Sequence, residues 1–179
     1  MKRIAAAIAV VVLAACTGKP EAMRSDWEIQ NAGQLAKEAA ADVPALPRYP
    51  VTADLVEFTA DGLSGFRLGI DPVSLTVSDG IVRYALVARS TNGADNTTYE
   101  ALNCRTGEYR IYASGRAEGR WIEQHSPWRE VGRRPIQRSL MRDYFCPGRR
   151  AIYSVQEGIS ALREGGHPQA DAQDPTSGR

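Results

Sequence analysis

The side chains with chemical potential in this sequence are three cysteines, two histidines and a concentration of arginines. The cysteines are Cys16, Cys104 and Cys146, and the histidines are His125 and His167. The two histidines lie near neither each other nor a cysteine pair, so the sequence lacks ligand spacing of the zinc type. We expect both histidines to face solvent, and we expect no metal or cofactor site.

Residues 1–16 have the three parts of a bacterial export signal. Lys2 and Arg3 form a positive start, and residues 4–13 form an unbroken apolar run. This run is shorter than the approximately 20 residues that a membrane-spanning helix needs. Leu13-Ala14-Ala15-Cys16 follows and resembles the lipobox of bacterial lipoproteins, in which the cysteine becomes the first residue of the mature chain and carries a diacylglyceryl thioether and an N-acyl chain.

We therefore predict a signal peptide over residues 1–15 and lipidation of Cys16. Several acyl chains on one residue exceed the two signals that stable membrane anchoring requires. Thr17 is not the aspartate that is associated with retention in the inner membrane, so we expect an anchor in the outer membrane, facing the periplasm. The alternative is an ordinary secretory signal in which the cysteine occurs by chance.

Cys104 and Cys146 remain once Cys16 is lipidated. Two cysteines in an exported chain predict one disulfide. The loop between them is about 42 residues long, which in the chain-entropy model stabilises the fold by about 4 kcal/mol. The alternative is a pair of buried free thiols.

Positive charge is concentrated between residues 105 and 150, which hold eleven arginines and five acidic residues. Residues 17–104 hold seven basic and twelve acidic residues. Arginine binds carboxylates and phosphates with planar, permanent charge. The candidate anion or partner surface consists of these side chains: Arg110, Arg116, Arg134, Arg138 and Arg142. The alternative is an ordinary solvated face, because the chain has only three lysines and arginine replaces lysine throughout.

Alternating patterns predict a succession of strands, each followed by a turn. The clearest are the run 81–90, which is apolar on both faces and suits a central position, and a hairpin formed by 99–103 and 109–114 around a turn at 105–108. Shorter strands are expected near residues 55–58, 66–70 and 121–122, with Asp71-Pro72 ending the second of these. Helices are predicted to follow, one starting at Pro135 and one at the capping-box pattern Ser154-Val155-Gln156-Glu157.

These elements predict an α+β fold, with an antiparallel sheet of about five to six strands and C-terminal helices packed on one face. In the first of these helices, Arg134, Arg138 and Arg142 would lie on one face at a spacing of four residues. Residues 16–50 would form the anchor, a linker and a possible helix over 26–41, with the three prolines of 42–50 forming a stiff strap. Residues 51–163 would form the single domain, and residues 164–179, which are poor in apolar side chains, a disordered tail.

The order of short motifs along residues 27–148 resembles the cryptic neisserial protein family of uncharacterised proteobacterial envelope proteins. The motifs are Phe66 to Ile70-Asp71-Pro72 with Ser74-Leu75, Asp79-Gly80-Ile81-Val82-Arg83-Tyr84-Ala85-Leu86-Val87, Ser90, Gly93-Ala94-Asp95-Asn96, Tyr99-Glu100, Cys104, Tyr109, Tyr112-Ala113, Gly115-Arg116, Gly119, Trp121 and Asp143-Tyr144-Phe145-Cys146-Pro147. A looser resemblance is to surface-adhesin protein E-type lipoproteins. Neither resemblance implies an enzymatic activity.

Three functional hypotheses follow. The first is a lipid-anchored envelope protein without catalytic activity, which binds another envelope protein or an anionic envelope polymer and not a nucleic acid. The second is a small periplasmic hydrolase or peptidoglycan-active enzyme that uses His125. The third is a structural role in envelope assembly without a small ligand.

Overall fold

The computed structural model describes residues 43–124 and 126–170. The predictions for the signal peptide, Cys16, the helix over 26–41 and His125 therefore lie outside the described residues. Within them, seven strands form one antiparallel sheet. The strands are β1 (Val56–Phe58), β2 (Phe66–Ser78), β3 (Ile81–Ser90), β4 (Asp95–Asn103), β5 (Glu108–Arg116), β6 (Arg120–Glu123) and β7 (Arg129–Glu130).

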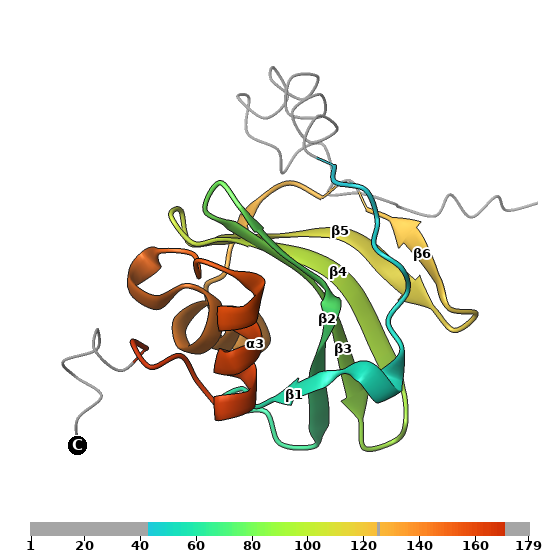
Figure 1. Ribbon diagram of the computed structural model, residues 1–179. Coiled ribbons are helices and arrows are strands. Elements are labelled where there is room, and N and C mark those ends of the chain that lie inside the picture. Colours follow the sequence, from blue (N-terminus) through green and yellow to red (C-terminus); the bar gives the residue numbers. More distant parts are fainter. Residues whose placement is uncertain (1–42, 125, 171–179) are drawn as a thin grey trace, which may run out of the picture.

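Five of the six strand pairings join strands that are consecutive in the chain. β1 to β6 are neighbours in sequence, and β7 pairs with β5 beside Tyr109, at the end of the strand that β6 does not reach. The helical elements after the strands are α2 (Pro135–Ser139), η3 (Leu140–Phe145), η4 (Pro147–Arg149) and α3 (Val155–Glu164), and the short η2 (Thr52–Asp54) precedes β1. The predicted α+β class is confirmed, with one strand more than expected. Figure 1 shows the sheet curving around the C-terminal helices.

Turn chemistry positions the central hairpins. Asp79 and Gly80 both have positive φ, at 54° and 78°, as a two-residue turn between β2 and β3 requires. In the β4–β5 turn, the Asn103 side chain accepts hydrogen bonds from the N–H groups of Arg105 and Thr106 at 3.1 and 3.2 Å. The β4–β5 turn lies where the sequence predicts it.

The prediction that Asp71-Pro72 ends a strand is wrong. β2 continues through Pro72 to Ser78, and its pairing with β3 shifts register between Asp71 and Thr76. The Ser74 hydroxyl replaces the interrupted ladder, since it donates to the Asp71 carbonyl at 2.7 Å and accepts from the Ala85 N–H at 2.7 Å. A bulge therefore lets the strand absorb a proline that has no N–H to donate.

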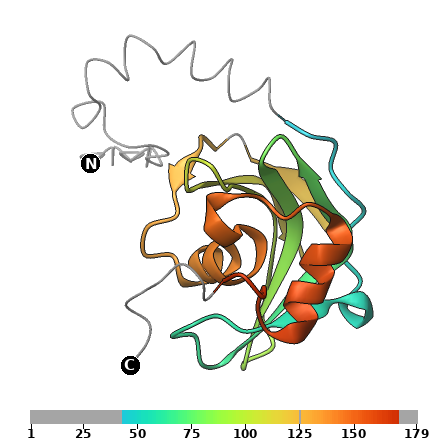
Figure 2. The same ribbon diagram turned by 60° about the vertical axis from the view of Figure 1, so that its left-hand side comes forward.

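The helices pack on one face of the sheet and close the main core. Side chains that alternate along β3, among them Tyr84, meet Phe145 of η3 and Leu162 of α3. Both views show α3 lying across this face beside β1 and β2 (Figures 1 and 2). Ser154 caps α3 as predicted, by accepting from the Glu157 N–H at 3.2 Å, and Gly165 ends the helix in the left-handed conformation.

A carboxyl group is buried beneath α2 in this core. Glu100 of β4 is 2 % exposed and accepts hydrogen bonds from Tyr84 Oη at 3.2 Å, Thr98 Oγ1 at 2.7 Å and Gln137 Nε2 at 2.9 Å. Burial raises the pKa of Glu100, although these three hydrogen bonds and the charge of Arg134 oppose the shift. The network fixes α2 to the sheet, because Gln137 of α2 donates a hydrogen bond to the carboxylate of Glu100 on β4.

The opposite face of the sheet is covered by residues 43–50, the predicted strap. Leu46 packs in a second cluster around Tyr99 and Tyr112, and Trp121 Nε1 donates to the Pro47 carbonyl at 2.9 Å. Arg48 reaches the fully buried Asp71 at 3.2 Å. The strap is therefore part of the folded domain. The charged side chain among its described residues is Arg48, which is positive.

The domain also extends past the predicted boundary at residue 163. His167 is 8 % exposed, and its backbone N–H donates to the Asp143 carbonyl at 2.6 Å. Its Nδ1 accepts from the Gln169 N–H at 3.1 Å, so Nε2 carries the proton toward Glu157 at 2.9 Å. The expectation of a solvent-facing His167 is wrong, and residues 165–170 pack on the domain.

We predict that Glu100→Gln stabilises the protein increasingly as the pH rises from 4 to 8. The folded-state pKa of Glu100 lies above that of the unfolded chain, so its contribution is complete below the unfolded pKa and is lost as the pH rises through the folded pKa. A glutamine stays neutral, its oxygen can accept from Tyr84 and Gln137, and its NH₂ can donate to the Thr98 hydroxyl.

Urea unfolding of both proteins at pH 4, 6 and 8 measures this difference, with Glu123→Gln on the exposed part of β6 as the control. A difference that does not change with pH would contradict the prediction. Glu100→Leu should instead destabilise the fold at every pH, by about 1–3 kcal/mol for each donor left unpaired.

We also predict that Gly115→Ala displaces the strap. A Cβ at Gly115 would lie 2.4 Å from Tyr49 Oη and 2.8 Å from Thr97 Cβ. The Tyr49 hydroxyl would lose its 3.2 Å hydrogen bond to the Arg116 carbonyl, and the fold should lose about 1–3 kcal/mol.

Tryptic cleavage after Arg48 reports strap release and should become faster in this variant. Gly166→Ala is the matched control, because its Cβ would make an ordinary 3.6 Å contact. Equal cleavage rates in the two variants would show that the strap does not depend on Gly115.

Candidate partner-binding site

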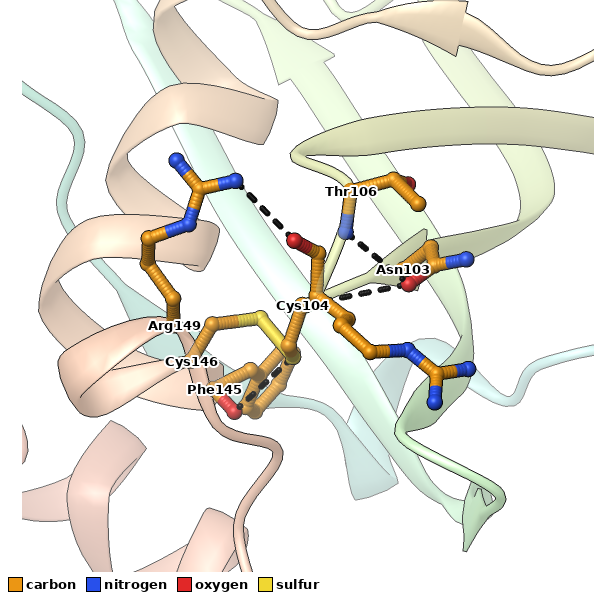
Figure 3. Close-up of a disulfide and its surroundings, with 7 residues drawn as sticks. Asn103, Cys104, Thr106, Phe145, Cys146 and Arg149 are labelled. Carbon is orange, nitrogen blue, oxygen red and sulfur yellow. Dashed lines mark hydrogen bonds between the residues drawn. A yellow bond between two sulfur atoms is a disulfide. The ribbon is translucent and has the colours of Figure 1, made fainter.

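A disulfide joins the β4–β5 turn to the helical layer. Cys104 and Cys146 form a bond of 2.03 Å with their Cα atoms 5.2 Å apart, and both are buried. The bond closes a loop with a sequence separation of 42, and the predicted pairing is confirmed. Figure 3 shows the Cys104 sulfur close to the Phe145 carbonyl oxygen, a contact of 3.6 Å.

The segment after Cys146 turns sharply and returns toward Cys104. Gly148 and Arg149 both have positive φ, at 65° and 59°. This conformation costs a non-glycine residue about 1–2 kcal/mol, so contacts around Arg149 must hold it. One such contact is the hydrogen bond from the Arg149 guanidinium to the Arg105 carbonyl at 2.9 Å, which Figure 3 shows beside the disulfide.

An open hollow of about 420 Å³ lies next to the disulfide. Its walls come from the β2–β3 turn, the β4–β5 turn and residues 149–153. Arg105, Arg149 and Arg150 are exposed at this hollow, and Val77 and Ile152 supply apolar wall. Tyr153 at its edge is 84 % exposed. We call this region the disulfide hollow.

The three arginines of the disulfide hollow lack a carboxylate partner among residues 43–124 and 126–170. Other arginines do have one: Arg48, Arg67, Arg89, Arg120 and Arg142 each form an ion pair with an aspartate or glutamate. Asp79 also lines the hollow, but it forms no ion pair with these guanidiniums in the described part of the chain. The hollow therefore has a positive rim that can take up an anionic group.

The five arginines that the sequence grouped as one surface are not brought together. The Arg134 guanidinium lies over the ring of Tyr109, 4.8 Å from the ring centroid. Tyr109 lies near the start of β5, and Arg116 is the last residue of the same strand. Tyr109 and Arg116 are seven positions apart along the strand, which corresponds to about 23 Å. Arg138 is exposed near Arg134, on α2. A single face made of all five side chains is therefore ruled out by the fold.

Arg110 and Arg142 are already used within the protein. Arg110 is 1 % exposed and its guanidinium lies 5.0 Å from the centroid of the Tyr112 ring, so its placement on a surface was wrong. The segment after β6 crosses this part of β5, where Ser126 Oγ donates to the Ile111 carbonyl at 2.7 Å. Arg142 binds the carboxylates of Asp61 and Asp143 at 2.6 and 2.5 Å, which raise its pKa.

The expected spacing of Arg134, Arg138 and Arg142 also fails for a local reason. α2 has five residues and continues as η3, a π-helix over Leu140–Phe145. A π-helix bonds each N–H five residues back, so residues four apart no longer lie above one another. The Cys146 N–H accordingly donates to the Met141 carbonyl at 3.1 Å.

A second, polar hollow of about 450 Å³ lies between Asp61, Arg142 and His167. Its groups satisfy one another, because Arg142 is ion-paired and both ring nitrogens of His167 have partners. Burial raises the pKa of Glu157, but hydrogen bonds from His167 and from the backbone of Tyr153 and Ser154 outweigh it and lower the pKa. These contacts tie the C-terminal segment to α3.

Sequence reasoning overlooked Arg149 and Arg150 as site residues. A signal was present, because basic residues follow both cysteines of the expected disulfide: Arg105 directly after Cys104, and Arg149-Arg150 three residues after Cys146. Once the disulfide forms, these positions must converge.

Two negative findings concern only the described residues. They contain no group of three or more His, Cys, Asp or Glu side chains that could hold a metal ion. In the same part of the chain, none of the helices has the length and apolar character needed to cross a membrane.

Comparisons with known proteins identify the family. No curated protein and no solved structure is significantly similar to the chain. The family model described as CNP1-like family matches residues 32–163, which is well over half of the 179 residues and contains the strands, the disulfide and most of α3. The resemblance that the order of sequence motifs indicated is thereby confirmed, and the chain belongs to the CNP1-like family.

Proposed function

We propose that this chain is a lipid-anchored bacterial cell-envelope protein that acts as a non-catalytic binding or structural module. The observation that carries the proposal is the export pattern ending in Leu13-Ala14-Ala15-Cys16, with its cysteine at the position that lipidation requires. Cys16 would hold the protein at the outer membrane, and the folded domain would face the periplasm.

The disulfide supports this location. Disulfides persist in the periplasm and are rare in the reducing cytoplasm. Cys104 and Cys146 are paired in the fold and both are buried, whereas a third cysteine left over would be a free reactive thiol. Lipidation of Cys16 gives all three cysteines a chemical role.

The disulfide hollow supports a binding role over a catalytic one. It brings together guanidiniums and an exposed aromatic ring, which recognise ligands, on a rigid base. His167, the histidine within the described residues, is buried and hydrogen-bonded through both ring nitrogens. The catalytic alternative thus rests on His125 alone, and turnover of envelope substrates that disappears in His125→Ala would favour it.

We predict that full-length protein made in bacterial cells incorporates an alkyne-labelled fatty acid and sediments with the outer membrane. Cys16→Ala should abolish both labelling and sedimentation, because the remaining thiols are joined as a disulfide. Fatty-acid labelling and density-gradient fractionation measure the two effects.

The matched control is a chain in which Cys104 and Cys146 are both replaced by alanine, which should still be labelled. Mass spectrometry of the wild-type N-terminus should find Cys16 as the first residue, modified by acyl chains. Membrane association that survives Cys16→Ala, with no label on the wild type, would overturn the proposed anchoring.

A further inference from the structure

We propose that the disulfide hollow binds an acidic segment of a partner protein, with its carboxylates on Arg105 and Arg150 and an apolar side chain against Tyr153. This inference rests on the proposed function, for which it names the binding site and the chemistry of the partner. The charge, the surface and the rigidity of the hollow each support this binding mode.

The charge of the hollow is available. Arg105 contributes its backbone to the contacts of the turn, since its N–H donates to the Asn103 side chain and its carbonyl accepts from Arg149. The guanidiniums of Arg105 and Arg150 are exposed and form no ion pair within the described chain. A carboxylate placed between them would form charge-assisted hydrogen bonds with both guanidiniums. No ion pair among the described residues would have to break first.

The surface around these charges suits a protein. Tyr153 is 84 % exposed, more than any other large apolar side chain that is exposed in residues 43–124 and 126–170. Arginine and tyrosine are enriched at the energetic centres of protein interfaces. Val77 and Ile152 give the hollow an apolar wall, which a carboxylate-bearing peptide can cover with a neighbouring side chain.

The same surface favours a peptide carboxylate over a phosphate. Asp79 lines the hollow, and its carboxylate oxygens can accept hydrogen bonds from peptide N–H groups, which a phosphate lacks. Arg149 has one N–H already committed to the Arg105 carbonyl, which leaves fewer donors to surround three phosphate oxygens.

The hollow is rigid before any partner binds. The disulfide fixes two of its walls, and the Ile152 N–H donates to the Phe145 carbonyl at 3.0 Å. The backbone N–H of Tyr153 is held by Glu157 Oε2 at 2.5 Å. A preformed site loses little conformational entropy on binding, so a small area of contact can give useful affinity.

The test is photo-crosslinking in cells, with the full-length chain carrying a photo-reactive phenylalanine derivative in place of Tyr153. The same derivative in place of Ile122, on β6, is the position control. Mass spectrometry then identifies the peptide joined at each site. We expect position 153, and not position 122, to join a segment of another protein with at least two Asp or Glu residues close to the linkage.

Two pairs of charge reversals make the test specific. Arg105→Glu with Arg150→Glu should abolish the crosslink, whereas Arg133→Glu with Arg138→Glu, which changes two exposed arginines outside the hollow, should leave it. Unchanged thermal unfolding of both variants shows that the fold is intact. In vitro, the detergent-solubilised full-length protein should bind a labelled synthetic copy of the segment, measured by fluorescence anisotropy, and the first pair should weaken binding about tenfold or more.

The proposal is overturned if the crosslinked segment lacks carboxylates, if the product is a glycolipid, or if the label joins residues 17–42 or 171–179 of the same chain. It is also overturned if position 153 yields no product, or if the two charge reversals act alike. Failure of the proposed function looks different. Loss of lipidation and sedimentation would refute the anchor, whereas peptide binding in vitro depends on the disulfide hollow and not on Cys16.

Discussion

The structure depends on the need to cover both faces of a curved sheet. Adjacent residues of β3 illustrate the constraint: Tyr84 and Ala85 point to opposite faces and both are 0 % exposed. Many antiparallel sheets leave one face in water, but this one has apolar side chains on both sides of its centre. The C-terminal helices cover one face, and residues 43–50 together with the segment after β6 cover the other. The strap is therefore a structural layer of the domain.

The helical layer is too short to be stable without fixed points. α2 has five residues, far fewer than an isolated helix needs in water. Gln137 binds the buried Glu100 near the start of the α2–η3 segment, and Cys146, directly after η3, is bonded to Cys104. A buried hydrogen-bonded network and a disulfide thus hold this segment at both ends, and the core side chains between them pack against the sheet. The π-helix of η3 lies between these two points.

Local patterns in the sequence predict most of the sheet, because period-two alternation and turn residues are properties of short segments. β3, the β4–β5 hairpin, the Asp79-Gly80 turn and the caps of α3 follow from such patterns. The features that the sequence did not predict depend on contacts between residues far apart in the chain. Pro72 lies within a strand where the Ser74 hydroxyl supplies a bond to Ala85 of the neighbouring strand, and the buried Arg110 lies on β5 where a later segment crosses that strand. Neither contact leaves a periodic signal.

The candidate site could not be predicted from the sequence for the same reason, although the residues that form it could be identified there. Arginine spacing along one predicted helix suggested a surface, but the π-helix changed that spacing and Asp61 neutralised Arg142. The disulfide, which cysteine counting did predict, is what brings Arg105 and Arg150 to one hollow from positions far apart in the chain. Formation of the hollow therefore depends on oxidation of the two cysteines. A reduced chain would lack the bond that holds the β4–β5 turn against residues 149–153, so the hollow would lose the covalent link between its walls.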